Sequence, residues 1–167
     1  MYTATILTIS DKGARGLRQD TAGPAVESIL QSAGYTVVHT AILPDDRARI
    51  EAALIESADL RQVNLVLTVG GTGFSPRDTT PEATIAVCER MTPGIPEAMR
   101  CASLQLTKRA MLSRAVAGIR KNTLIINLPG SEKAAKENLE AVIDSIAHGL
   151  DMLLGTKSEC ASNPALQ

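Results

Sequence analysis

Short apolar runs alternate along this chain with stretches in which apolar residues recur at helical spacing. The run over residues 3–10 is rich in β-branched residues and has no polar alternation, which predicts a strand covered on both faces. Further strands are predicted over residues 36–43, 65–69 and 123–128. Pro44 marks the exit of the second of these strands, because proline cannot continue the hydrogen-bonded ladder.

Helical spacing predicts a helix over about residues 23–33, and Gly34 ends it as a left-handed cap would. Asp45 and Asp46 open the next helix, where acidic side chains suit the positive end. A long helix is predicted after residue 131. Its apolar face consists of Leu139, Val142, Ile143, Ile146, Leu150 and Leu153.

Two more helices complete the pattern. One begins at Thr79 or Thr80, with Glu82 as a capping-box partner, and the choice between the two threonines stays open. The other covers residues 96–106, whereas residues 107–121 are too irregular to predict an element. Strands that alternate with helices imply right-handed crossovers and a mostly parallel sheet with helices on both faces.

The length of 167 residues suits one domain, which we expect over residues 1–155, with a frayed polar tail over residues 156–167. Lys and Arg total 17 against 18 for Asp and Glu, so the charge gives no hint of a nucleic-acid or membrane partner. The chain has no Trp, and this argues against a surface on which the bases of a single-stranded nucleic acid stack. No apolar run comes near the roughly 20 residues that a membrane-spanning helix needs. No cleavable signal precedes the first strand, and we expect a cytoplasmic protein.

The run over residues 68–82 carries the most chemistry. It joins a strand to a helix through Gly70, Gly71, Thr72 and Gly73, where glycines let backbone N–H groups approach a ligand. It matches neither the Walker loop nor the dinucleotide fingerprint, and by itself it could be a plain connecting turn. The following pair Arg77-Asp78 favours a site that holds a phosphate and a metal ion together, as phosphoryl or nucleotidyl transfer requires.

Polar groups follow several strands at the point where each strand ends. They are Ser10 and Asp11 after the first strand, Asp45 after the second, the glycine run after the third, and Pro129, Gly130 and Ser131 after the last. In a parallel sheet, ligands gather at the carboxyl ends of the strands. We therefore expect these four segments to share one site.

Asp45 and Asp78 are the carboxylates that we expect to act in catalysis, and we expect both to coordinate Mg²⁺. The alternative is that they only cap helices, and for Asp46 we prefer that interpretation. Arg114 could bind a phosphate or pair with an acid, and Ser113 lacks the context of a nucleophilic serine.

The remaining candidates have structural interpretations. His39 and His148 lack a partner pattern and are more simply structural or surface residues. Phe74 could cover a planar ring, but anchoring its loop to the core is the favoured interpretation. Three cysteines, expected to be buried thiols, have no metal-ligand spacing: Cys88, Cys101 and Cys160.

With these motifs in view, the chain resembles the Mog/MoaB family, and most closely its molybdopterin adenylyltransferase (MogA-like) branch. The matching stretches follow the family order and cover the chain to about Leu154. They are residues 9–11, 43–45, 68–84, 113–114 and 128–131. The resemblance implies a three-layer α/β/α domain, assembled as a homotrimer. The resemblance implies that MoaB-like members lack the aspartate-containing loop in this form, whereas this chain keeps Pro76, Arg77 and Asp78.

The resemblance also implies an activity in molybdenum cofactor biosynthesis. Molybdopterin and ATP would react with Mg²⁺ to give adenylylated molybdopterin and pyrophosphate, ahead of molybdate insertion by a partner enzyme. The family's two catalytic aspartates match Asp45 and Asp78. The other matching residues would bind the substrates, together with the glycine run and the turn at 129–131. The alternative is a non-catalytic MoaB-like protein that carries molybdopterin.

Overall fold

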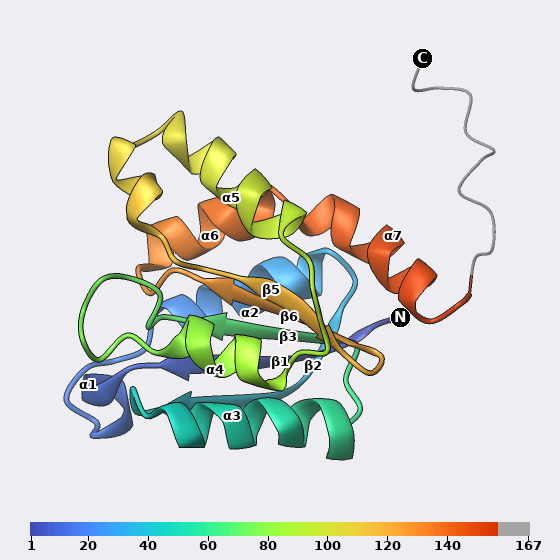
Figure 1. Ribbon diagram of the computed structural model, residues 1–167, viewed down its shortest axis with the longest axis horizontal. Helices are drawn as coiled ribbons and strands as arrows, with labels where there is room; N and C mark the ends of the chain where they lie inside the picture. The colour runs from blue at the N-terminus through green and yellow to red at the C-terminus, as the bar shows by residue number, and fades with distance from the viewer. Residues whose placement is uncertain (157–167) are drawn as a thin grey trace.

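The computed structural model describes residues 1–156, which form a six-stranded sheet packed between helices (Figure 1). The strands are β1 (Thr3–Ile9), β2 (Thr36–Leu43), β3 (Leu65–Val69), β4 (Arg90–Met91), β5 (Ala117–Arg120) and β6 (Thr123–Leu128). The α-helices are α1 (Asp11–Ala14), α2 (Ala22–Ser32), α3 (Arg47–Ile55), α4 (Thr80–Val87), α5 (Gly94–Leu104), α6 (Glu132–Glu140) and α7 (Ile143–Leu153). A π-helical turn η1 (Glu56–Leu60) extends α3, and a 3₁₀ turn η2 (Lys108–Leu112) follows α5.

The sheet has the order β2-β1-β3-β6-β5-β4, and its first four strands are parallel. The four predicted strands and the mostly parallel sheet with helices on both faces are thus confirmed. The other two strands were not predicted: β5 runs antiparallel to β6, and β4 runs antiparallel to β5. They are short, and Gly118 of β5 approaches Cys88 so closely that a Cβ would lie 2.7 Å from the sulfur. Such an edge depends on contacts between distant residues, which no local pattern records.

The predicted helices differ from the structure mainly at their ends. Helix α2 stops before Gly34, whose φ of +84° confirms the left-handed cap. Asp46 is the N-cap of α3, accepting a hydrogen bond from the Arg49 N–H at 2.9 Å, as preferred from the sequence. The prediction of a single long C-terminal helix was wrong, because the helix breaks at Ala141 into α6 and α7. The break lets both helices direct apolar residues into the same core cluster.

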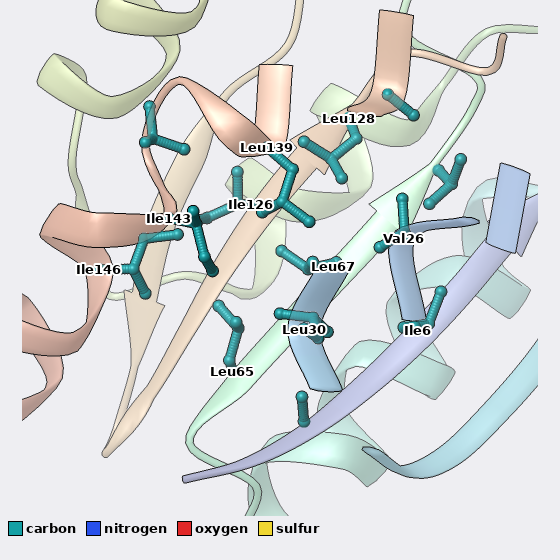
Figure 2. Packing of buried hydrophobic residues seen from close by; sticks show 14 of the residues in the cluster. Ile6, Val26, Leu30, Leu65, Leu67, Ile126, Leu128, Leu139, Ile143 and Ile146 are labelled. Atoms are coloured by element: carbon teal, nitrogen blue, oxygen red, sulfur yellow. The ribbon is translucent and has the colours of Figure 1, made fainter. Parts of the chain in front are cut away.

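Two clusters of buried apolar side chains hold the layers together. The larger cluster joins one face of the sheet to α2, α5, α6 and α7 (Figure 2), and the smaller joins the other face to α3 and α4. Successive residues of the central strands alternate between the clusters, with Leu65 and Leu67 in the larger and Val66 in the smaller. Burial on both faces explains why β1, β3 and β6 show no alternation of buried and exposed residues.

A buried polar group links this core to the site. The side chain of Asn127, on β6, donates hydrogen bonds to the hydroxyls of Thr68 at 3.0 Å and Thr84 at 2.9 Å. Its oxygen accepts a hydrogen bond from the N–H of Val116 at 3.3 Å. One amide thereby connects β6, β3, α4 and the segment before β5, and it holds α4 against the sheet.

The cysteines do not form a buried set. Cys88 is half-buried, and burial raises the pKa of its thiol to about 11, whereas Cys101 is exposed on α5. The expectation of a buried thiol was therefore wrong for Cys101, because this position faces away from the core cluster. Cys160 and most of the predicted tail lie outside the described residues. Within residues 1–156, no helix is long and apolar enough to span a membrane.

An ion pair fastens the antiparallel edge to the rest of the domain. The guanidinium of Arg120, on β5, donates to both carboxylate oxygens of Asp59 on η1, at 3.0 and 2.6 Å. Only 20% of the Arg120 side chain and 18% of the Asp59 side chain are exposed. The hydrogen bond from Arg120 holds the pKa of Asp59 below its usual range.

This pair predicts a pH-dependent difference in stability. Because the pKa of Asp59 is lower in the folded state than in the unfolded state, its ionised form stabilises the fold above the unfolded pKa of about 4, and that stabilisation is lost as pH falls through the folded pKa. Asp59→Asn should lower Tm at pH 7, and the difference from wild type should shrink as pH is lowered from 5 towards 3. Thermal melts across this range measure it, and a constant difference would contradict the pairing.

Candidate active site

Three strand ends meet at Gly70 with almost no space between their backbones. Gly70 has a φ of +112°, and a Cβ there would collide with the carbonyl oxygen of Ile9 at the end of β1. On the other side lies Gly130, after β6, where a Cβ would come within 3.2 Å of the Gly70 Cα. Position 70 therefore requires glycine, and position 130 leaves little room for anything larger. The predicted meeting of strand exits is confirmed for β1, β3 and β6.

The glycine loop, residues 70–79, leaves backbone donors beside this contact. Gly70 donates its N–H to the Leu128 carbonyl oxygen at 3.0 Å, and Gly73 donates to Asp78 at 3.0 Å. The N–H groups of Gly71, Thr72 and Gly130 donate no hydrogen bond to any described residue. All three residues line cavities, so their N–H groups can serve an anionic ligand.

Two cavities lie on either side of this backbone. The first, of about 300 Å³, is lined by residues that include Ser10, Asp45, Gly70 and Ser131. The lining of the second, of about 460 Å³, includes Thr72, Gly73, Ser113 and Pro129. Three residues line both cavities: Gly71, Asp78 and Gly130. We call these three residues the shared wall.

Asp45 follows β2 and lines the first cavity. Its Oδ2 accepts a hydrogen bond from the Asp11 N–H at 2.9 Å, while its Oδ1 faces Gly71, 3.2 Å from the place of a Cβ. Burial raises the pKa of Asp45; the neighbouring Asp11 and Asp78 carboxylates also raise it, whereas the Asp11 N–H and Arg77 lower it. A nearby cation would favour the ionised form of an acid in such surroundings.

Asp78 lies near the end of the glycine loop and stabilises its turn. The same oxygen, Oδ2, accepts hydrogen bonds from the N–H groups of Gly73 at 3.0 Å and Ser75 at 3.2 Å. Asp78 belongs to the shared wall and therefore lines both cavities. The residue therefore has a structural part in the loop. The alternative that Asp78 only caps a helix was wrong, because its carboxylate accepts hydrogen bonds within the loop and the N-cap position of α4 is Thr79.

The donor set of the first cavity suits Mg²⁺ only in part. Asp45 and Asp78 both line this cavity, and their carboxylates are hard oxygen donors. Within residues 1–156, no group of three or more His, Cys, Asp or Glu side chains could hold a metal ion. Mg²⁺ commonly binds through one or two carboxylates and completes its shell with water and phosphate oxygens. The two residues thus fit a cation whose remaining ligands are water and phosphate oxygens.

Arg114 braces the glycine loop from the side of the second cavity. Its guanidinium donates to the carbonyl oxygens of Gly73 at 2.7 Å and Asp78 at 2.6 Å, and it pairs with Glu82. Its backbone N–H donates to the Thr72 carbonyl oxygen at 2.9 Å. These bonds engage the guanidinium fork, so Arg114 lies behind the loop and lines neither cavity.

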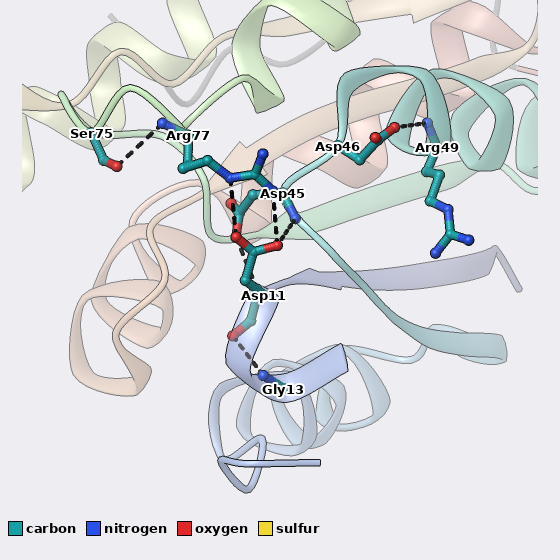
Figure 3. A network of polar contacts seen from close by, with 8 residues as sticks. Asp11, Gly13, Asp45, Asp46, Arg49, Ser75 and Arg77 are labelled. Atoms are coloured by element: carbon teal, nitrogen blue, oxygen red, sulfur yellow. Dashed lines mark hydrogen bonds and ion pairs between the residues drawn. The ribbon is translucent and has the colours of Figure 1, made fainter. Parts of the chain in front are cut away.

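Asp11 and Arg77 brace the loop from the other side (Figure 3). Arg77 donates through Nε to one Asp11 oxygen at 3.1 Å and through Nη2 to the other at 3.0 Å. The hydrogen bond from Arg77 holds the pKa of Asp11 below its usual range. Asp11, like Arg114, lines neither cavity.

The predicted site residues are therefore brought together, with eleven of them in the cavity walls and Asp11 and Arg114 behind. Two serines also cap helices: Ser10 accepts from the Gly13 N–H at 3.1 Å, and Ser131 accepts from the Ala134 N–H at 3.3 Å. His39 and His148 line neither cavity.

Two details of the loop differ from expectation. Phe74 does not anchor the loop to the core, since 70% of it is exposed. The chain around it turns outward between the two arginine braces, which hold the loop in place of an apolar anchor. Thr79 is the N-cap position of α4, but its hydroxyl makes no capping bond, and Glu82 bonds to Arg114 instead of closing a capping box.

Sequence reasoning missed several cavity residues. In the first cavity, Asp20 accepts hydrogen bonds from the Ala22 and Gly23 N–H groups, at 3.1 and 2.9 Å, and thereby caps α2. An acid just before a predicted helix is a recognisable capping signal. Arg100 and Arg109 of the second cavity carried no such signal: Arg100 lies within the predicted helix 96–106 without a motif around it, and Arg109 lies in the irregular segment that follows.

Comparison with known proteins assigns the chain to a family. The family model described as a probable molybdopterin binding domain matches residues 5–148, which include every residue of the shared wall. The chain belongs to this family. It is 44% identical over 152 residues to a molybdopterin adenylyltransferase of Helicobacter pylori strain J99, covering 90% of this chain and 86% of that protein.

Two further relatives are similar over most of the family domain. A molybdopterin adenylyltransferase of Escherichia coli K12 is 46% identical over 151 residues, which are 87% of this chain and 77% of that protein. The solved structure of the molybdopterin biosynthesis enzyme MoaB from Thermus thermophilus superposes with a TM-score of 0.89 at 46% identity. The superposition covers 93% of this chain and 98% of that one. The expected Mog/MoaB fold is confirmed.

The tight contact at the shared wall predicts an unequal effect of two alanine substitutions. Gly71 and Gly16 have nearly equal φ values, +66° and +70°, but a Cβ at Gly71 would collide with the Thr80 hydroxyl, whereas nothing lies within 4 Å of one at Gly16. Both changes incur the left-handed strain, and Gly71→Ala should cost about 1–3 kcal/mol more through overpacking. Urea unfolding of the two variants measures the difference, and equal losses would refute the close approach.

Proposed function

We propose that this protein is a molybdopterin adenylyltransferase, which transfers AMP from ATP to the terminal phosphate of molybdopterin and releases pyrophosphate. The observation that carries the proposal is the shared wall, where Gly71, Asp78 and Gly130 line two adjoining cavities. A transfer between two substrates needs two binding spaces that meet at one point. The curated relatives at 44% and 46% identity carry the same activity in their names.

In this reaction, an oxygen of the molybdopterin phosphate attacks the α-phosphorus of ATP. A new P–O bond forms, the bond from the α-phosphorus to the bridging oxygen breaks, and pyrophosphate leaves with that bond's electron pair. Such transfers depend on alignment and on stabilisation of negative charge more than on a strong base. The N–H groups of Gly71, Thr72 and Gly130 can donate to phosphate oxygens on both sides of the wall.

The proposal assigns metal binding to Asp45 and Asp78. They would hold Mg²⁺ in the first cavity together with phosphate oxygens of the substrates. A bound Mg²⁺ supplies charge neutralisation for the phosphates as they meet. Asp78 also fixes the loop through Gly73 and Ser75. Its carboxylate would therefore bind the cation and also hold the loop whose N–H groups donate to the phosphates.

We extend the proposal to a cytoplasmic homotrimer that passes its product to a molybdate-inserting enzyme. The family resemblance supports this extension. Large apolar side chains such as Leu106 and Met111, which are 64% and 63% exposed, are available for contacts between subunits. Sedimentation velocity of the purified protein tests the trimer, and a monomer at all concentrations would contradict it.

Substitution of the two aspartates should separate catalysis from folding. With molybdopterin, ATP and Mg²⁺, the wild-type protein should release pyrophosphate, and Asp45→Asn and Asp78→Asn should each lower kcat by a factor on the order of 10²–10³, as loss of a preorganised charge contact does. Asp46→Asn is the matched control, because Asn caps α3 as well as Asp does and Asp46 lines neither cavity. It should retain full activity. Pyrophosphate release no faster than without protein would reject the enzyme.

Binding of ATP distinguishes the enzyme from a carrier of molybdopterin. A carrier has no need of a nucleotide site, whereas the two cavities predict that ATP with Mg²⁺ and molybdopterin bind together. Titration calorimetry should give heat for each ligand alone. A second titration of the molybdopterin-loaded protein uses an ATP analogue with a methylene group in place of the α,β-bridging oxygen, so that no transfer adds heat, and it should still give heat of binding. Binding of molybdopterin without binding of ATP would favour the carrier.

A further inference from the structure

Two arginines hold the glycine loop from opposite sides, and they do so in different ways. Arg114 is partly buried and bonds directly to the carbonyl oxygens of the loop. Arg77 belongs to the loop itself, and its side chain, 61% exposed, extends away to bond with Asp11 on α1. Among the described residues, the Arg77–Asp11 pair is the one ion pair that ties the loop to the β1–β2 side of the site.

Asp11 is in turn bonded to Asp45 in both directions. The Asp11 N–H donates to Asp45 Oδ2 at 2.9 Å, and the Asp45 N–H donates to Asp11 Oδ1 at 3.1 Å. One Asp11 oxygen therefore accepts from Asp45 and from Arg77 at once. Figure 3 shows the three side chains together, with Arg77 over Asp11 and Asp45 beside it. A continuous chain of bonds runs from the loop to the carboxylate at the end of β2.

We propose that Arg77 is a positioning residue for nucleotidyl transfer: through Asp11 it fixes the glycine loop, and with it Asp78, relative to Asp45. The inference rests on the proposed function of the site. Asp45 and Asp78 come from different elements, and a shared ligand requires them at a constant separation. Gly73 and Ser75 hold the Asp78 carboxylate within the loop, and Arg77 is next to Asp78 in the chain, so the bond to Asp11 constrains where the loop places that carboxylate relative to Asp45.

Two other roles for Arg77 fit the structure less well. Direct binding of a phosphate is disfavoured because Arg77 lines neither cavity and presents its Nε and Nη2 to Asp11. A role in global stability is disfavoured because a pair with one strongly exposed partner contributes little to folding free energy. The fork of two parallel bonds gives orientation instead, which a single point charge does not.

The chain offers a specific probe of loop position. Phe74 is its only phenylalanine and lies exposed in the glycine loop. Biosynthetic incorporation of 4-fluorophenylalanine therefore gives one ¹⁹F signal from the loop, without a change in sequence. In the ligand-free protein, Arg77→Gln and Asp11→Asn should each change the shift or width of this signal in the same direction. Asn at position 11 keeps an oxygen for the Asp45 N–H, so the substitution weakens the fork more than the bond to Asp45.

The matched control removes another exposed ion pair. Arg61 bonds to Glu56 of η1 at 2.8 Å, and it lines neither cavity. Arg61→Gln should leave both the ¹⁹F signal and the activity as in the wild type. All variants should melt close to the wild type, which separates a local change in the loop from unfolding.

Kinetics then test whether the pair acts as one unit. Arg77→Gln and Asp11→Asn should each lower kcat by about 10- to 100-fold, as a misplacement of about 1 Å can do, with little change in KM for either substrate. The double variant should lose no more than the more affected single variant, because both changes break the same bond. Losses that multiply, or a rise in KM for Arg77→Gln alone, would mean that Arg77 binds substrate directly and would overturn the proposal.

The two readouts keep this inference separate from the proposed function. If the wild-type protein releases no pyrophosphate, the adenylyltransferase proposal fails, whereas the ¹⁹F signal still reports whether Arg77 and Asp11 hold the loop. If the wild type is active and neither variant changes the signal or kcat, the positioning role is overturned and the function stands.

Discussion

The architecture of the site depends on a contact between backbones. At Gly70 and Gly130 the ends of β3 and β6 come together against the carbonyl group of Ile9, with no room for a side chain at Gly70. This contact keeps the strand exits at one place and leaves N–H groups available on both sides. A wall of side chains would be thicker and would separate the two cavities. Where the wall is mostly backbone, groups bound on the two sides can reach one another.

The polar residues around this contact divide into two kinds. Asp45 and Asp78 face the cavities, whereas Asp11, Arg77 and Arg114 hold those two residues and the loop in place. The polar residues of the loop therefore serve either to line the cavities or to hold the loop in place, and only those of the first kind can contact a ligand. This division explains how an exposed segment with its one large apolar residue turned to solvent can keep a defined shape: charged forks replace the apolar anchor that such a loop would otherwise need.

Much of this arrangement could be predicted from the sequence, because two of its causes are local or topological. Buried parallel strands have continuous apolar runs, and parallel strands share an edge where their exits gather, which placed Asp45 beside the glycine loop. The rest depends on distant partners. Arg77 and Asp11 are 66 positions apart, and nothing in either segment identifies the other as its partner. The edge strand β5 likewise exists because β6 is beside it, and the break between α6 and α7 follows from the core that both helices cover.

The thinness of the shared wall couples binding in one cavity to binding in the other. Gly71 and Gly130 each line both cavities, so any shift of the wall caused by one occupant alters the space offered to the other. Such coupling is reciprocal by thermodynamic linkage: whatever factor the first ligand applies to the affinity of the second, the second applies to the first. The backbone between the two cavities can thereby transmit the binding of a ligand in one cavity to the affinity of the other.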